Sequence, residues 1–393
     1  MAVARSGRFD SALTLLSRAR ATDPENSDLQ LAEARVLGWA GRSGEAIAKY
    51  DSLLKRNPKN ADAMVGLGYV YHWQGRDGEA RRQADLALGL DSTSSDALEL
   101  RRAIRRVTQG AVEVSANWNN DSDRNTNFLE TLAFTSPIAG SLRFLATATG
   151  LEASDPIRNA TRVGGEGGLA LSIGRLTASA LAGARRLDPE IGPSRTEATY
   201  RGSVSLRPSP RFGIGAGYAR YPYDDIASLF ERDLTIESLE AGFDAHSGSG
   251  LLVTGGGGGL WLSDGNRRLD GHATLLQEIG RHLAIGASGR ALGYREVGVG
   301  YFSPNRFHLL EGNASARIGN DRWDGRLSGG LGAQQVGRSG DTQTEWHVEG
   351  RLGKNWGEGN RIEAFGGVTN SAVSSTTGAF RYRNAGVLVR LGI

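Results

Sequence analysis

At 393 residues the chain has room for two domains, and because it contains no cysteine it has neither a disulfide framework nor a thiolate metal site. The first 110 residues hold 17 of the 46 basic and 14 of the 43 acidic residues, which leaves 29 of each in residues 111–393. This balance argues against nucleic-acid binding, which favours a basic face. No apolar run reaches the roughly 18 to 20 residues of a transmembrane helix, whereas a membrane β-strand needs only about 9 to 11 residues, half of them polar.

A period of 34 residues runs through the first 110 residues. Four residue types recur with it: glycine at Gly7, Gly41 and Gly75, alanine at Ala12, Ala46 and Ala80, proline at Pro24 and Pro58, and tryptophan at Trp39 and Trp73. This period is typical of the tetratricopeptide repeat, in which small residues let neighbouring helices pack closely. We therefore predict a helical tetratricopeptide array over residues 1–110, sealed by a capping helix over residues 93–107.

Such arrays present a concave surface to a partner protein, although two or three repeats could also serve only as a spacer or cap. The phase of the repeat aligns residues 1–6 with the last turn of a helix. We therefore expect the natural chain to begin earlier, with further repeats and an export signal upstream.

From Ala111 onward the helical period gives way to alternation of polar and apolar residues, clearest over residues 197–207. Strand side chains alternate between faces, so each such segment has one apolar and one polar face. We predict sixteen strands, which begin near residues 112, 127, 140, 161, 175, 194, 211, 235, 249, 266, 283, 306, 321, 341, 360 and 379.

The connections between these strands alternate between tight turns and longer polar loops. Short periplasmic turns and long external loops are typical of outer-membrane barrels. Tryptophans near predicted strand ends fit an interfacial belt. We therefore predict an outer-membrane β-barrel over residues 111–393, so that the chain as a whole is an α + β protein of two domains. An even number of strands puts both barrel ends on one side, which would place the repeats in the periplasm. The alternative is a soluble β-sandwich or β-helix.

The polar face of the predicted strands carries a mixed set of charges, which we expect to line the lumen: Glu197, Arg201, Arg207, Asp270, Glu278, Arg290, Glu311, Arg317, Arg326, Glu345, Glu349, Arg351 and Glu363. Mixed charge predicts a hydrated channel or an internally braced plug without strong preference for anions or cations. A neutral or weakly charged polymer would suit it.

Two histidines share a strand face with carboxylates: His272 with Asp270, and His347 with Glu345 and Glu349. A general base and its orienting carboxylate could meet there, which leaves a surface hydrolase as an alternative. No serine stands in a nucleophile-elbow context, and no histidine pair has metal-ligand spacing. We expect no enzyme, no catalytic residue, no cofactor and no metal site.

An aromatic segment, Gly298–Phe307, occupies a predicted external loop just before a strand. We propose two roles for its Tyr301, Phe302 and Pro304: contact with sugar rings at a pore mouth, or anchoring of the loop at the membrane interface.

The sequence of that segment, GYFSPNRF, together with repeats that run directly into a barrel, resembles the C-terminal region of the cellulose synthase operon protein C family. The repeat segments Val36–Arg42 and Val70–Arg76 are similar to the YaiO family of tetratricopeptide outer-membrane barrels. The resemblance implies a sixteen-stranded barrel that exports a polysaccharide and is fed by a periplasmic repeat scaffold.

Our leading hypothesis is therefore an outer-membrane export pore for a cellulose-like exopolysaccharide. The repeats would dock periplasmic or inner-membrane synthesis proteins, and the barrel would sit in outer-membrane lipid. The alternative is a non-conducting barrel that anchors a periplasmic interaction scaffold.

Overall fold

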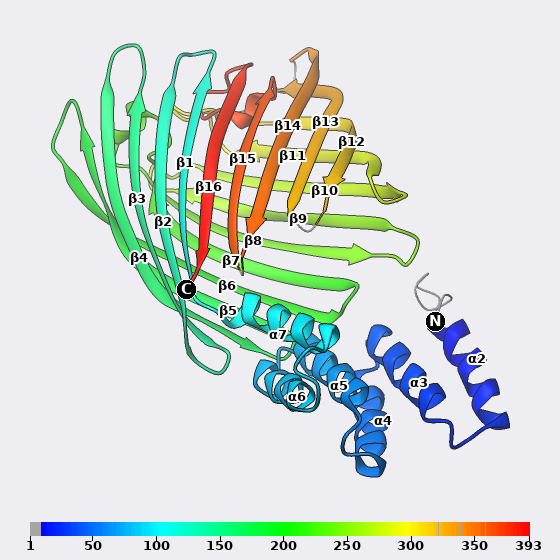
Figure 1. Ribbon diagram of the computed structural model, residues 1–393. Helices are drawn as coiled ribbons and strands as arrows, with labels where there is room; N and C mark the ends of the chain where they lie inside the picture. Colours follow the sequence, from blue (N-terminus) through cyan, green and yellow to red (C-terminus); the bar gives the residue numbers. More distant parts are fainter. Residues whose placement is uncertain (1–8, 321, 338–339, 358) are drawn as a thin grey trace.

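The computed structural model describes residues 9–320, 322–337, 340–357 and 359–393, and it consists of a helical domain followed by a β-barrel (Figure 1). Within these residues the helical domain contains α2 (Phe9–Thr22), α3 (Ser27–Trp39), α4 (Ser43–Arg56), α5 (Ala61–Trp73), α6 (Asp77–Leu90) and α7 (Ser95–Thr108). Gly7 and the segment 1–6 lie outside the described residues. None of the described helices is long and apolar enough to cross a membrane.

The helices pack as the 34-residue pattern predicts. Gly41 and Gly75 follow α3 and α5 with φ angles of +75° and +72°, a left-handed conformation that glycine adopts without strain. Ala46 and Ala80 are fully buried among neighbouring helices. The capping helix α7 completes the second of these cores with Leu100 and Ile104.

Sixteen antiparallel strands close into a barrel in which each strand pairs with its sequence neighbours and β1 pairs with β16. The strands are β1 (Ala111–Asp121), β2 (Thr126–Ala139), β3 (Leu142–Ser154), β4 (Asn159–Ile173), β5 (Leu176–Pro189), β6 (Arg195–Ser209), β7 (Phe212–Pro222), β8 (Thr235–His246), β9 (Leu251–Leu262), β10 (Arg267–Ile279), β11 (Leu283–Tyr294), β12 (Phe307–Gly319), β13 (Trp323–Val336), β14 (Thr342–Trp356), β15 (Asn360–Thr369) and β16 (Tyr382–Gly392). Each strand begins within three residues of its predicted start, which confirms the predicted fold class.

Both ends of the barrel chain lie on the side of the helices, and Ile393 N donates a hydrogen bond to Gly110 O over 3.0 Å. We call this side the proximal end and the opposite side the distal end (Figure 1). Arg143, at the proximal start of β3, donates hydrogen bonds to the carbonyl oxygens of Val107 and Gln109, which follow or end the last helix. These contacts hold the helical domain against the rim of the barrel.

The outer surface of the barrel is apolar. Large hydrophobic side chains on alternate strand positions are exposed there, and tryptophans near strand ends belong to this set: Trp261, Trp323, Trp346 and Trp356. An exposed apolar surface on a closed wall is what lipid requires, because no backbone hydrogen bond is left open.

Candidate functional site

The inner surface of the barrel carries the charges. On β6 the apolar Tyr200, Val204 and Leu206 are exposed on the outer face, so Arg201 and Arg207 project from the opposite, inner face. The strand register carries this inner face around the wall, and it includes all thirteen residues that we predicted to line the lumen: Glu197, Arg201, Arg207, Asp270, Glu278, Arg290, Glu311, Arg317, Arg326, Glu345, Glu349, Arg351 and Glu363.

Many inner charges form ion pairs that span an intervening strand. Arg201 Nε on β6 lies 2.7 Å from Glu166 Oε2 on β4, and Arg207 on β6 donates two hydrogen bonds to Asp244 on β8 over 2.9 and 3.0 Å. We did not predict Glu166 and Asp244 as lining residues, although their alternation within β4 and β8 was a usable signal. Pairing of this kind braces the wall and leaves little net charge along the lumen.

A cavity of about 1150 Å³ lies inside the barrel. Its lining includes Arg207, Arg268, Asp270, His272 and Arg290, together with backbone from β9. The run of five glycines, residues 255–259, forms part of β9 and carries no phosphate-binding loop. Because these glycines project no side chains, the wall is thin and the cavity is widened at this point.

The distal end is closed by three inward-folded loops, residues 223–234, 295–306 and 370–381, which we call the lid (Figure 1). They contain the short helices α8 (Ala227–Phe230) and η1 (Ala372–Ser374). Apolar residues from all three loops pack against the inner wall in one buried cluster: Tyr223, Ile226, Leu229, Leu234, Tyr301 and Ala372 from the lid, with Ile236, Leu260, Leu262, Leu292, Tyr294 and Phe307 from the strands. This cluster turns the distal mouth into a core, so the barrel is closed there.

A buried ion-pair cluster anchors the first lid loop. Asp224, whose side chain is only 1% exposed, accepts hydrogen bonds from Arg162 Nη1 on β4 over 3.0 Å and from Arg185 Nη1 on β5 over 3.2 Å. Asp225 keeps contact with water but is enclosed by protein. Loss of solvation and repulsion from Asp224 raise the pKa of Asp225 to about 6.

Polar contacts also anchor the third lid loop. Gln334 on β13 donates to Asn370 O over 2.9 Å and accepts a hydrogen bond from Ala372 N over 3.0 Å. Phe302 N donates to Thr376 O over 2.7 Å, which joins the second and third loops. The lid is therefore one connected unit rather than three independent loops.

The structure places the predicted external-loop residues inside this lid. Tyr301 is buried between Tyr223 and Tyr294, and its hydroxyl donates to Asp264 Oδ2 over 2.9 Å. Phe302 packs against the same cluster, and Pro304 is also buried. The hypothesis that they anchor the loop at the membrane interface is wrong, because they pack against other loops inside the barrel mouth. Contact with sugar rings stays a prediction for an open lid.

The proximal end holds a second cavity of about 1280 Å³, between the helical domain and the barrel rim. It is lined mainly by aromatic and apolar side chains: Phe9, Trp39 and Trp73 from the helices, with Ile173 and Pro210 from the barrel. The helix-ending glycines dock on barrel turns here, since a Cβ atom at Gly41 would lie 3.3 Å from Pro210 Cδ and one at Gly75 would lie 3.4 Å from Gly174 O. The repeat thus presents its tryptophans to the barrel entrance.

The two histidine hypotheses have different outcomes. Asp270 pairs with Arg268 Nη2 at 3.1 Å, which gives it a partner other than His272. His347 Nδ1 approaches Glu345 at 3.8 Å, and also Glu311 of β12 at 3.1 Å. Sequence reasoning had not brought Glu311 and His347 together, because they lie on strands separated by β13.

Comparison with known proteins identifies the helical part. Residues 31–95 match the family model of the tetratricopeptide repeat. No curated protein sequence matches the chain. The chain therefore combines a tetratricopeptide-repeat array with a closed, sixteen-stranded barrel of the outer-membrane type.

Solved structures share the barrel fold. A "bacterial polysaccharide outer membrane secretin" superposes with a TM-score of 0.60 at 13% identity, over 73% of this chain and 99% of that chain. CdiB from Acinetobacter baumannii gives 0.47 at 8% identity, over 72% and 60% of the two chains. OccK3 (OpdO) of Pseudomonas aeruginosa gives 0.40 at 12% identity, over 72% and 95%. At these identities the likeness concerns the fold.

Proposed function

We propose that this protein is an outer-membrane pore for export of a polysaccharide, with its tetratricopeptide repeats in the periplasm. The observation that carries the proposal is the order of features along one axis. An aromatic cavity lies at the proximal mouth, a lumen of paired charges follows, and a lid of packed loops closes the distal end. A polymer would enter beside the repeats and leave through the lid.

The lengths of the connections support the orientation. Short turns such as residues 174–175 face the helical domain, whereas the long loops that form the lid lie at the distal end. Outer-membrane barrels carry short turns on the periplasmic side and longer loops outside. The distal end would thus face the exterior, and the repeats would meet periplasmic or inner-membrane synthesis proteins through their exposed surface.

A neutral or weakly charged glycan is the cargo that best suits this interior. The inner charges are largely paired, so the lumen gives little electrostatic preference. Trp39 and Trp73 supply flat apolar faces at the entrance. The similar structure is described as a polysaccharide secretin, and the GYFSPNRF segment favours a cellulose-like polymer. We propose no covalent chemistry for any residue.

A non-conducting anchor is the second candidate, and the closed lid favours it. In that case the barrel would only hold the repeats at the membrane. A hydrolase that uses His272 or His347 is a third candidate. Loss of hydrolytic activity in a variant with both His272→Gln and His347→Gln would support that third function, whereas unchanged activity would remove it.

The test is single-channel recording in a planar bilayer, with cello-oligosaccharides or N-acetylglucosamine oligomers added to either side. We would compare the natural chain with a variant in which residues 371–379 are replaced by a short Gly-Ser turn. We expect the variant to conduct steadily and oligosaccharides to block it. A folded variant that stays silent would support the anchor, and conductance insensitive to every oligosaccharide would refute polysaccharide export.

A further inference from the structure

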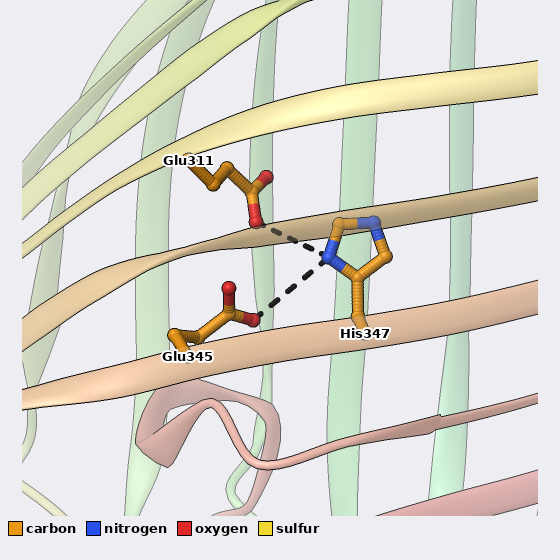
Figure 2. A group of neighbouring side chains, drawn as sticks. All are labelled: Glu311, Glu345 and His347. Carbon is orange, nitrogen blue, oxygen red and sulfur yellow. Dashed lines mark ion pairs between the residues drawn. The ribbon is translucent and has the colours of Figure 1, made fainter.

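A group of side chains on the inner wall is not used by the export proposal. Glu311 on β12 and Glu345 and His347 on β14 bring one ligand atom each within 4.8 Å of the others. His347 Nδ1 lies 3.1 Å from Glu311 Oε2 and 3.8 Å from Glu345 Oε1, and the three side chains point toward one another (Figure 2). Side chains from β12 and β14 thus meet across the intervening strand β13.

Two glycines on β13 permit this convergence. The register places Gly332 opposite both Glu311 and Glu345, and it places Gly330 opposite His347. A Cβ atom at Gly332 would lie 2.6 Å from Glu311 Cβ, and one at Gly330 would overlap the His347 ring. The wall is free of side chains only where the three groups need the space.

The carboxylates are buried and short of partners. The Glu345 side chain is only 2% exposed, and its Oε2 has no hydrogen-bond partner, while Oε1 accepts one from Thr369 Oγ1 over 3.4 Å. Glu311 Oε1 accepts a hydrogen bond from Ser288 Oγ over 2.6 Å, but its Oε2 faces His347 without the alignment of an N–H hydrogen bond.

Burial of carboxylate oxygens without partners is costly unless a cation completes their coordination. Within residues 9–320, 322–337, 340–357 and 359–393, the only ion-pair partner of Glu311 or Glu345 is His347. Two carboxylates and one imidazole retain a net negative charge even when the imidazole is protonated. The cluster therefore has room and charge for one cation.

We propose that Glu311, Glu345 and His347 bind one divalent transition-metal ion, for which zinc is the best fit. One imidazole nitrogen and two carboxylate oxygens are a ligand set that zinc accepts, and three protein ligands leave a fourth position for water. Ligands about 2.0 to 2.1 Å from a tetrahedral zinc lie roughly 3.3 to 3.4 Å apart. The observed separations of 3.1 and 3.8 Å bracket that value. Calcium and magnesium prefer an all-oxygen set.

The ion would tie β12 to β14 next to the lid. Thr369, which donates to Glu345, directly precedes Asn370, where the third lid loop begins. Asn370 Oδ1 accepts a hydrogen bond from Trp346 N over 2.7 Å, between the two metal-binding residues of β14. Bound metal would therefore stiffen the wall on which that loop is anchored. This inference does not depend on the export function.

The test is calorimetric titration of the purified, metal-stripped full chain with Zn²⁺, combined with Co²⁺ substitution to record the absorption of a tetrahedral site. We expect one zinc ion per natural chain. Glu345→Gln removes one charged ligand at constant size, and we expect its zinc affinity to fall by at least ~100-fold, because loss of even an outer partner costs about 10- to 100-fold. Glu113→Gln, on the inner face of β1, is the matched control and should bind zinc like the natural chain.

Three results would overturn the proposal: no zinc binding by the folded natural chain, natural affinity in Glu345→Gln, or calcium binding in place of zinc. The first would mean that the cluster holds a proton instead of a metal ion. Gel mobility with and without heating reports whether each barrel has folded. Should Glu345→Gln fail to fold, His347→Gln replaces it, with the same loss expected.

Discussion

Replacement of Asp224 by asparagine should open the lid. Asp224 is the anion between Arg162 and Arg185, at 3.0 and 3.2 Å, and the Arg162 side chain is only 8% exposed. Asparagine keeps the size of the side chain and one acceptor oxygen but removes the charge. Two guanidinium groups would then lie side by side without their shared counter-ion, and a loop that moves outward would let water reach them.

The structure supports an estimate of the effect. Removal of one partner from a buried ion pair costs about 3 to 5 kcal/mol, and the retained acceptor oxygen favours the lower end. About 3 kcal/mol corresponds to a roughly hundred-fold rise in the ratio of open to closed lid. Single-channel recording measures this ratio as the fraction of time spent conducting, in the natural chain and in Asp224→Asn under the same voltage and salt.

The matched control is Glu231→Gln in the same lid loop. Glu231 pairs with Arg158 at 3.2 Å, but both side chains are more than 20% exposed, and a pair of this kind contributes only about 0 to 1 kcal/mol. We expect its open fraction to change by less than about five-fold. The reasoning would be refuted by a folded Asp224→Asn barrel that opens no more often than the natural chain, or by a Glu231→Gln barrel that opens equally often.

Three further predictions concern pH, cargo and packing. The Asp225 pKa is raised from 3.8 to about 6, so its proton favours the closed lid; this contribution is complete below pH 3.8, is lost as pH rises through 6, and should vanish from pH-dependent recordings of Asp225→Asn. Trp73→Ala should weaken oligosaccharide block from the proximal side about five-fold, the equivalent of about 1 kcal/mol of ring contact, whereas Leu86→Ala on α6 should leave the block unchanged. Gly330→Ala should lower barrel stability in urea unfolding by about 1 to 3 kcal/mol because its Cβ overlaps His347; Gly312→Ala, with no atom nearer than 3.9 Å, is its control, and equal stability of the two variants would contradict the packing argument.

The sequence predicted the wall well for a physical reason. Lipid outside and charge inside impose a period of two on every strand, so a strand such as β6 announces both its position and its inner face. The repeats are equally legible, because Gly41 and Ala46 recur at a spacing that one helix pair requires.

The lid was beyond the sequence because its residues are far apart along the chain. Tyr301 is buried against Tyr223, 78 positions earlier, and the loop of Ala372 completes the cluster. A polar, aromatic loop has the same composition whether it extends into solvent or folds into the barrel. Only the spatial proximity of three loops at one mouth decides between the two, and alternation patterns carry no information on it.

The cluster of Glu311, Glu345 and His347 was partly legible. All three residues were expected on the inner face, yet the sequence paired His347 only with carboxylates of its own strand. Its closer neighbour is Glu311, which the register across β13 brings to 3.1 Å. Register depends on every turn between two strands, so a prediction of strand starts within a few residues does not fix it.

Two glycine-rich strands have opposite consequences for the lumen. On β9 the space left by residues 255–259 stays open and adjoins the 1150 Å³ cavity. On β13 the space over Gly330 and Gly332 is filled by acidic and imidazole side chains from both neighbouring strands. A chain passing through the barrel would therefore run along β9, where the wall offers backbone and no bulk. The opposite wall, cross-linked over β13, would resist the outward pressure of that chain and keep the lid anchored on one side while it opens on the other.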